Sequence, residues 1–285
     1  MPSVCDYRPW AGPRSSPGIG QSGLMTADDA TKAKGSELLR LHQDEKLLTV
    51  VNVWDVISAK TVAAVDGTAA LATASHSIAA SFGYPDGEQI PLDLMLEQVK
   101  RVVDATDLPV TADLEGGYGD APETVRRAIG IGVVGANIED QLKPVAEAAA
   151  QVEAIMKAAE DEGVDFVLNA RTDAFALNRK GDPAENLKVA VERGKAYLDA
   201  GAPVVFVPAF LNEEQILTLV EAYGPRRLTT IGIPGTPPRD WQEAHGVART
   251  SYGPMSQNVA LTALQELVEE VHRGGGVPGT MRLLN

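Results

Sequence analysis

The sequence predicts an α/β protein whose parallel strands close into a (β/α)8 barrel, the TIM-barrel fold. Short, nearly continuous apolar runs alternate with longer runs of helical periodicity, a pattern typical of parallel strands buried on both faces. Eight such units fit between residue 28 and the C-terminus, and about 250 residues is the usual length of this barrel. A doubly wound open sheet gives the same alternation and is the alternative fold.

The eight expected strands are short and rich in β-branched residues. In chain order they are 47–53 (LLTVVNV), 69–73 (AALAT), 109–112 (PVTA), 133–138 (VVGANI), 165–169 (DFVLN), 204–207 (VVFV), 228–233 (LTTIGI) and 246–250 (GVART). The helices expected between and after them include 92–105, 122–131, 146–162, 183–200, 212–223 and 255–272. Glycine closes several of these helical runs, as is common at a helix C-terminus, at Gly132, Gly163, Gly201 and Gly224.

The first 24 residues differ in composition and hydrophobic pattern from the rest of the chain. They are rich in Pro, Gly and Ser and show no periodicity, which predicts a flexible N-terminal tail at 1–24. Residues 25–285 are expected to form a single barrel domain. With 44% hydrophobic and 22% charged residues, the composition is that of a globular protein with a full core.

Charge and cysteine content exclude several classes of function. The chain has 25 Lys and Arg against 39 Asp and Glu, a formal charge of -14, which argues against nucleic acid or an anionic membrane as a partner. Cys5 is the only cysteine, so an intrachain disulfide and a cysteine zinc site are excluded. The sequence shows neither an apolar run near 20 residues nor a signal-peptide pattern, so a cytoplasmic protein is expected.

Acidic residues follow two neighbouring strands at the edge where barrel enzymes carry their active sites. Asp113 and Glu115 come directly after the third expected strand, and Glu139 follows the fourth. Unpaired carboxylates at a buried strand end are costly and repel one another, and a divalent cation would remove both problems. An all-oxygen ligand set favours Mg²⁺ or Mn²⁺. In the alternative interpretation these acids cap helices or pair with Lys or Arg.

A cation and several hydrogen-bond donors share this edge of the barrel. Arg171, after the fifth strand, has the planar fork that binds a carboxylate or a phosphoryl group. Its alternative role is an ion pair with Asp173 or Glu139, and the two roles are compatible. Ser75 and His76, after the second strand, are candidates to bind a substrate carboxylate, although His76 is equally explained as a satisfied histidine at a strand end.

Four motifs together resemble the isocitrate lyase/phosphoenolpyruvate mutase superfamily. They are 82–86 (FGYPD), 113–119 (DLEGGYG), 137–141 (NIEDQ) and 170–174 (ARTDA). They resemble the superfamily's Leu-Gly-x-x-Asp, Asp-x-Asp-x-Gly-Tyr-Gly, Ile-Glu-Asp and Ala-Arg-Thr-Asp-Ala, with Glu in place of the second Asp of the second motif. Each motif is weak alone, but their order and spacing are specific. The resemblance runs from about residue 41 to residue 275.

The resemblance implies an enzyme that acts on a small 2-oxo or 2-hydroxy acid. It implies a barrel whose last helix is exchanged between the subunits of a homotetramer or dimer. It implies Mg²⁺, with Mn²⁺ as the alternative, bound mainly by Asp113 and reached directly or through water by Asp86, Glu115 and Glu139. The substrate would bind the metal, and the metal would stabilise the enolate that forms as a C–C or C–P bond breaks. Its anionic groups would bind to Arg171 and near Thr73, Ala74, Ser75 and His76.

The sequence departs from the superfamily pattern at the acid/base and substrate positions. Superfamily lyases carry a Lys-Arg-Cys-Gly-His loop after the fourth strand, but here 141–144 (QLKP) leads almost directly into the next helix. Methylisocitrate-type lyases place a Glu after the sixth strand, where this chain has Pro208, which is expected to line the substrate pocket. Candidates for the acid/base are therefore Tyr118, His76, Tyr252 or a metal-bound water.

Three functions fit these residues. The first is a Mg²⁺-dependent lyase that cleaves a C–C bond in a small 2-oxo or 2-hydroxy dicarboxylate. The second is phosphonomutase or phosphonopyruvate-hydrolase chemistry, which the short loop disfavours because phosphoryl transfer needs cationic donors beside the moving group. The third is a 2-oxo acid-binding protein of weak activity that has lost the acid/base loop.

Overall fold

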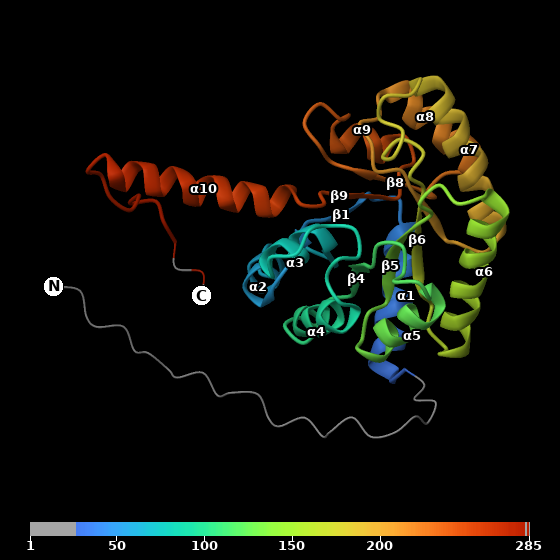
Figure 1. Ribbon diagram of the computed structural model, residues 1–285, viewed down its shortest axis with the longest axis horizontal. Helices are drawn as coiled ribbons and strands as arrows, with labels where there is room; N and C mark the ends of the chain where they lie inside the picture. Colours follow the sequence, from blue (N-terminus) through green and yellow to red (C-terminus); the bar gives the residue numbers. More distant parts are fainter. Residues whose placement is uncertain (1–26, 283, 285) are drawn as a thin grey trace.

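The computed structural model describes residues 27–282 and 284, and it confirms the expected barrel (Figure 1). The described residues form nine strands in the order β1-β9-β8-β7-β6-β5-β4-β3-β2, and all eight strand pairs are parallel. β1 (Leu48–Val50) and β2 (Asn52–Val53) divide one expected strand. Because β1 pairs with β9 and β2 pairs with β3, the sheet closes through this divided strand. The expected tail, 1–24, lies outside the described residues.

The remaining strands alternate with helices along the chain. The strands are β3 (Leu71–Thr73), β4 (Val110–Asp113), β5 (Gly135–Glu139), β6 (Val167–Arg171), β7 (Val204–Phe206), β8 (Leu228–Ile231) and β9 (Arg249–Ser251). The helices are α1 (Asp29–Gln43), α2 (Val56–Ala63), α3 (Ser75–Ser81), α4 (Leu92–Val103), α5 (Ala121–Gly130), α6 (Val145–Asp161), α7 (Pro183–Asp199), α8 (Glu213–Tyr223), α9 (Arg239–Ala244) and α10 (Met255–His272). All six expected helices are present, and α1, α2, α3 and α9 are additional.

The expected strand boundaries are wrong by up to three residues, and the error matters at the site. Asp113, Glu139 and Arg171 were expected after their strands but are the last residues of β4, β5 and β6. The parallel ladder extends to them, because Asp113 pairs with Asn137 and Glu139 pairs with Arg171. These side chains are therefore held by sheet backbone rather than by loops.

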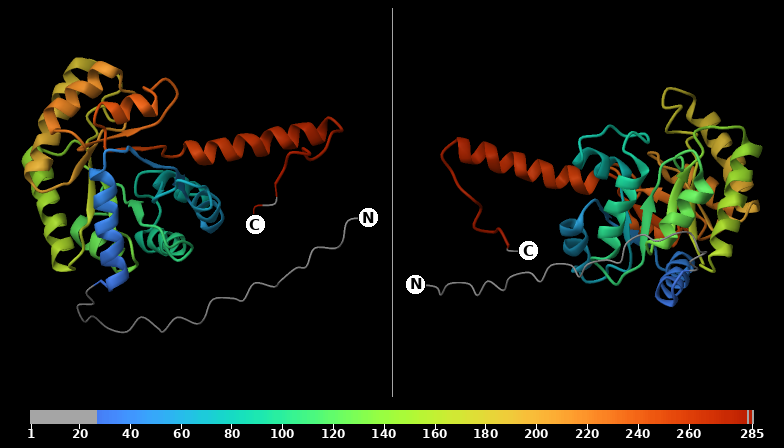
Figure 2. Two further views of the ribbon diagram at one scale, coloured as in Figure 1. Left: turned by 180° about the vertical axis from the view of Figure 1, so that it is seen from behind. Right: turned by 60° about the horizontal axis from the view of Figure 1, so that its bottom comes forward.

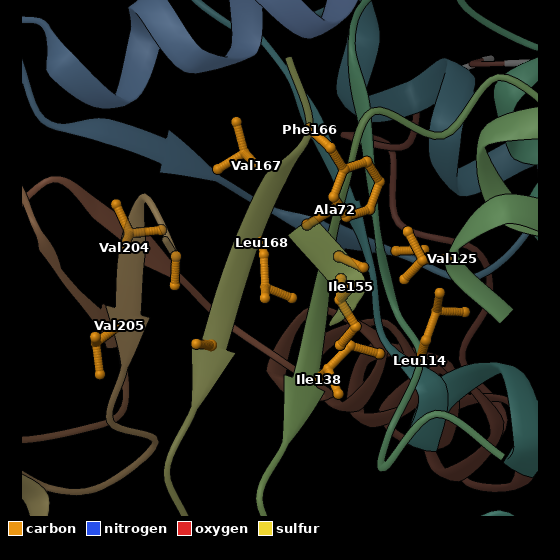
Figure 3. Packing of buried hydrophobic residues seen from close by; sticks show 14 of the residues in the cluster. Ala72, Leu114, Val125, Ile138, Ile155, Phe166, Val167, Leu168, Val204 and Val205 are labelled. Carbon is orange, nitrogen blue, oxygen red and sulfur yellow. The ribbon is translucent and has the colours of Figure 1, made fainter. Parts of the chain in front are cut away.

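The core lies between the strands and the helices that surround them. Figure 3 shows buried apolar side chains of this layer, among them Leu168 of β6 and Ile155 of α6, which are both fully buried. Burying each such side chain stabilises the fold by about 1.5–3 kcal/mol. The apolar outer face of the strands thus fixes which strand residues point the other way, into the barrel.

Polar side chains line the inside of the barrel below the site. Asn169 donates from Nδ2 to Asn137 Oδ1 at 2.7 Å, and Thr229 donates from Oγ1 to Asn169 Oδ1 at 2.6 Å. Since side chains two residues apart share one face of a strand, Glu139 and Arg171 project into the barrel above Asn137 and Asn169. The inward face of β5 and β6 therefore leads directly to the site.

Helix α10 extends away from the barrel (Figures 1 and 2). Its first turn is anchored, because buried Gln257 donates to Ser77 O and to Ser81 Oγ, both at 3.1 Å. Farther along, apolar side chains are at least 45% exposed at Val259, Leu261, Leu264, Val268 and Val271. Among the described helices, none combines the length and the apolar character that crossing a bilayer requires.

Candidate active site

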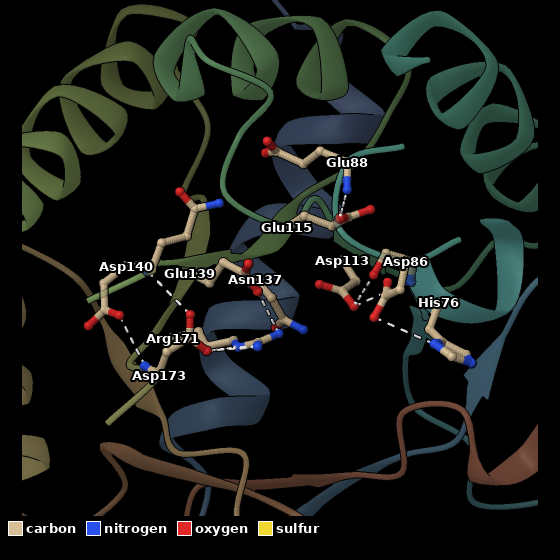
Figure 4. Close-up of polar contacts among 12 residues, drawn as sticks. His76, Asp86, Glu88, Asp113, Glu115, Asn137, Glu139, Asp140, Arg171 and Asp173 are labelled. Carbon is tan, nitrogen blue, oxygen red and sulfur yellow. Dashed lines mark hydrogen bonds and ion pairs between the residues drawn. The ribbon is translucent and has the colours of Figure 1, made fainter. Parts of the chain in front are cut away.

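Asp113 stands at the mouth of the barrel with one free carboxylate oxygen (Figure 4). Its Oδ2 accepts hydrogen bonds from Ser75 N at 3.3 Å and Ser75 Oγ at 2.9 Å, and its backbone N–H donates to Thr73 Oγ1 at 3.1 Å. Its Oδ1 is buried and has no hydrogen-bond partner among the described protein atoms. An unpartnered buried carboxylate oxygen is costly unless a cation or water satisfies it.

Glu115 is buried, only 4% exposed, and held in a left-handed backbone conformation with φ of 54°. Its carboxylate accepts hydrogen bonds from Glu88 N and, at 3.3 Å, from the Tyr118 hydroxyl. Burial, together with the nearby charges of Asp113 and Asp86, raises the pKa of Glu115 to about 7. The folded chain thus holds Glu115 at the boundary between the protonated and ionised forms at neutral pH.

Arg171 is held between two carboxylates. Its Nη1 lies 2.7 Å from Glu139 Oε2, and its Nη2 and Nε lie 2.7 and 2.8 Å from Asp173 Oδ1. Both ion pairs suggested by the sequence are therefore present. Burial nevertheless raises the pKa of Glu139 to about 8. Arg171 lowers this pKa, but the negative charges of Asp173, Asp113 and Glu115 oppose the effect of Arg171.

Asp140 joins the loops that follow β5 and β6, and so supports the arrangement of Glu139, Arg171 and Asp173, called here the Arg171 clamp. Its Oδ1 accepts hydrogen bonds from Asp173 N and Leu142 N, both at 3.0 Å. Its Oδ2 binds Arg193 Nε at 2.7 Å and the Tyr197 hydroxyl at 2.5 Å, from α7. Burial alone would raise the pKa of Asp140, but these bonds outweigh it and hold the pKa below its usual range. Asp140 is therefore an ionised structural anchor.

The other proposed site residues surround the same mouth. His76 in α3 lies 3.5 Å from Asp86 Oδ2, and both side chains are about half exposed. Burial and the neighbouring Glu115 raise the pKa of Tyr118, so its hydroxyl stays protonated at neutral pH and is a donor rather than a base. Ala74 is the N-cap of α3, and Pro208 follows β7 by two residues.

The carboxylates share one rim but do not form a preassembled metal cage. Within residues 27–282, no three His, Cys, Asp or Glu side chains converge at metal-ligating distance. Glu139 is bound to Arg171, Glu115 to Glu88 and Tyr118, and Asp86 to His76. The donor set still fits a hard divalent cation, because it is all oxygen and Asp113 Oδ1 lacks a partner. Asp113 is the residue best placed to hold such an ion.

The raised pKa values predict how pH affects the metal-free protein. Glu115 and Glu139 bind protons more tightly when folded, so their contribution to stability is full below about pH 4.5 and is lost as the pH rises through about 7 to 8. Burial lowers the pKa of His42 to about 3, and this opposes the trend below about pH 6.5. Between pH 6.5 and 8.5 we expect the unfolding midpoint with EDTA to fall.

Added Mg²⁺ or Mn²⁺ is expected to reverse that trend. A cation competes with protons for Glu115 and Glu139, so its stabilising effect should grow between pH 6.5 and 8.5. Thermal unfolding at several pH values, with EDTA or with excess metal, measures both effects. A midpoint that rises with pH in EDTA, or a metal effect that is independent of pH, would contradict the assignment.

Sequence reasoning missed several residues that organise the site. Glu88 contacts Glu115 from the loop after α3, and its only signal was the Pro-Asp-Gly-Glu turn. Arg193 and Tyr197 sit four residues apart in α7, which places them on one helix face, but the sequence does not say what that face meets. Arg249 of β9 is buried inside the barrel with Nε and Nη1 unpartnered among the described atoms.

Two of the known proteins that the chain resembles are lyases. The chain is 32% identical over 197 residues to isocitrate lyase of Haloferax volcanii, covering 63% of this chain and 55% of that protein. It is 29% identical to 2,3-dimethylmalate lyase of Eubacterium barkeri, covering 88% and 89%. The chain therefore spans little more than half of the isocitrate lyase but nearly all of the dimethylmalate lyase.

Solved structures share the fold over most of the chain. A crystal structure from Burkholderia cenocepacia J2315, of a protein provisionally named a phosphonomutase, is 41% identical with a TM-score of 0.78, covering 83% of this chain and 99% of that one. Oxaloacetate acetylhydrolase in complex with oxalate is 25% identical with a TM-score of 0.78, covering 90% and 92%. A family model described as phosphoenolpyruvate phosphomutase matches residues 38–272. The chain belongs to this family, within the isocitrate lyase/phosphoenolpyruvate mutase superfamily of enzymes.

Proposed function

We propose that the chain is a Mg²⁺-dependent lyase that cleaves a C–C bond in a small 2-oxo or 2-hydroxy dicarboxylic acid. The observation that carries this proposal is the buried, unpartnered Oδ1 of Asp113 on a rim shared with Glu115, Glu139 and Arg171. The names of the relatives support the chemistry, since they include lyases of methylisocitrate and dimethylmalate and a decarboxylase of oxaloacetate.

The protein residues have separate roles in this proposal. Asp113 would hold Mg²⁺, with Mn²⁺ as the alternative, and Asp86, Glu115 and Glu139 would bind it directly or through water. The bound cation would stabilise the negative charge that develops on the substrate oxygen as the bond breaks. Arg171 would attract the second anionic group of the substrate, while Thr73, Ala74, Ser75, His76 and Pro208 would line its pocket.

Tyr118 and His76 are the proposed catalytic donors of the site. The Tyr118 hydroxyl contacts Glu115, and its raised pKa keeps it protonated, so it can donate a hydrogen bond to negative charge that develops on the substrate. His76 is the second candidate, because it is exposed at the rim and faces the Asp86 carboxylate. The chain needs such a group because β5 ends at Glu139 and α6 begins at Val145, which leaves no room for a long acid/base loop.

C–P chemistry is the second candidate function. The 41% identical structure with a phosphonomutase name favours it. Against it, phosphoryl transfer needs several cationic donors around the moving group, and the short connection between β5 and α6 leaves little room for the loop that would supply them. A protein that binds 2-oxo acids with weak activity is the third alternative.

A ligand panel tests the proposal. Thermal unfolding would be measured with 2-oxo acids, 2-hydroxy acids and phosphonates, each with and without Mg²⁺. A ligand present at a hundred times its Kd stabilises by about 2.7 kcal/mol, which shifts the midpoint measurably. We expect a Mg²⁺-dependent shift with dicarboxylic acids, followed by turnover of the ones that bind. A shift with phosphonates alone would favour C–P chemistry, and no shift from any acid would contradict the metal-dependent lyase.

We also propose that the chain assembles as a cytoplasmic homotetramer or dimer in which α10 packs on a second copy. The exposed apolar residues of α10, from Val259 to Val271, support this, because a helix with apolar side chains along its length needs a partner surface. The first turn of α10 starts beside α3, close to the candidate site. Exchange of this helix would therefore bring the second copy near the barrel mouth.

A further inference from the structure

Glu88 joins two loops of the candidate site through both its backbone and its side chain. Its backbone N–H donates to the Glu115 carboxylate, and its own Oε1 accepts a hydrogen bond from Tyr118 N at 2.7 Å. The Tyr118 hydroxyl closes the ring of contacts on Glu115 at 3.3 Å. Figure 4 shows Glu88 beside Glu115, with its carboxylate directed away from Asp113. Glu88 thus faces the loop after β4 rather than the open mouth.

The backbone at these three residues is strained. Glu88, Glu115 and Tyr118 all have positive φ, at 60°, 54° and 54°, a region that non-glycine residues occupy at a cost and that is concentrated at functional sites. The loop after β4, which carries Glu115 and Tyr118, is also closely packed against its neighbours at Gly116. A Cβ on Gly116 would lie 3.1 Å from Glu88 Oε1 and 2.3 Å from Gln141 Nε2. The surrounding contacts must therefore hold this conformation in place.

Glu88 is also the attachment of the segment that carries Asp86. Residues 82–87 and Gln89 are exposed, whereas Glu88 is partly buried and Ile90 is fully buried. Three sets of hydrogen bonds and ion pairs connect residues 84–89 to other described segments. Glu88 makes the bonds given above, Tyr84 N donates to Ala79 O, and Asp86 Oδ2 lies 3.5 Å from His76 Nδ1. Glu88 therefore fixes Glu115 directly and Asp86 two residues away.

We infer that Glu88 is a positioning residue, which holds the Asp86 segment against the loop after β4 and thereby sets two of the proposed metal ligands in place. The inference rests on the proposed function. The Glu88 carboxylate acts as a hydrogen-bond acceptor for Tyr118 N–H, and its charge is not required. A side chain that retains an acceptor oxygen at the same reach should therefore replace it.

Two variants separate positioning from charge. Glu88→Ala removes the acceptor, and Glu88→Gln keeps an acceptor oxygen without the charge. Titration calorimetry with Mn²⁺ alone, on the full chain at pH 8, should show Mn²⁺ affinity reduced about 10- to 100-fold in Glu88→Ala, the usual effect of losing a partner that orients a metal ligand. Glu88→Gln should stay within about threefold of the wild type. Glu97→Ala, at an exposed glutamate of α4, is the matched control and should bind as the wild type does.

A second readout needs no metal. Hydrogen exchange in EDTA should be faster at the Glu88 and Tyr118 amides in Glu88→Ala, and unchanged in Glu88→Gln, because only the first variant releases the two loops. Wild-type affinity in Glu88→Ala would overturn the inference, and so would Glu88→Gln as weak as Glu88→Ala, since charge would then matter. A wild-type protein that binds no Mn²⁺ would contradict the proposed function, while the exchange rates would still decide whether Glu88 joins the loops.

Discussion

Replacing Asp113 by Asn is expected to weaken Mn²⁺ binding by about a hundredfold or more and to abolish turnover. Even residues that only orient a metal ligand contribute about 10- to 100-fold to affinity, and Asp113 is the proposed central ligand itself. An amide keeps an oxygen for Ser75 but loses the charge that a hard cation requires. Titration calorimetry and Mn²⁺ paramagnetic resonance of the metal-free chain measure the loss.

The same substitution should leave the metal-free fold intact. The charge of Asp113 raises the pKa values of Glu115 and Glu139 but favours the charged form of buried Arg249, so removing it both relieves repulsion and loses attraction. The unfolding midpoint in EDTA should therefore change little, whereas Mg²⁺ should no longer raise it. Asp66→Asn, at an exposed position in the α2–β3 connection, is the control. Unfolding of Asp113→Asn in EDTA would instead identify Asp113 as a structural cap for α3.

Barrel topology explains why the rim of the site could be predicted from the sequence. Parallel strands all end at one face, so acids and an arginine at the ends of three consecutive strands had to meet there. That is why Asp113, Glu139 and Arg171 lie together even though the strand boundaries were wrong by a residue or two. Alternation along the strands then directs these side chains inward.

The contacts that hold the rim in place were not predictable in the same way. Arg193 of α7 contacts Asp140, which follows β5 and lies 53 residues away in the sequence, so the contact depends on tertiary packing rather than on local sequence. The Glu88 contacts require positive φ at three non-glycine residues, and local propensities disfavour that conformation. α3 has seven residues and no side-chain cap, so its helical signal was too weak to detect. These features depend on tertiary contacts between segments distant in sequence.

Asp140→Asn is expected to cause the largest loss of stability among single substitutions at the site. The Arg193–Asp140 pair is buried, with side chains only 6% and 3% exposed, so the variant leaves the guanidinium without its countercharge. Breaking one side of a buried pair typically costs about 3–5 kcal/mol. The ionised Asp140 has a lowered pKa, so this contribution should persist at neutral pH and disappear only as the pH falls below the usual range of aspartate.

Chemical denaturation of three variants at pH 7.5 separates this loss from a general effect of removing a charge. Asp161→Asn breaks an exposed contact with Lys157 and should cost less than about 1 kcal/mol. The double variant Asp140→Asn/Arg193→Met should recover part of the loss, because it removes the stranded cation as well. If Asp140→Asn were as mild as Asp161→Asn, the Asp140 contacts would not be what holds the Arg171 clamp. Asp140 Oδ1 accepts a hydrogen bond from Asp173 N, and the Asp173 carboxylate binds Arg171. A loss of stability in Asp140→Asn should therefore also make Asp173 and Arg171 more mobile, and so weaken the affinity for anionic ligands.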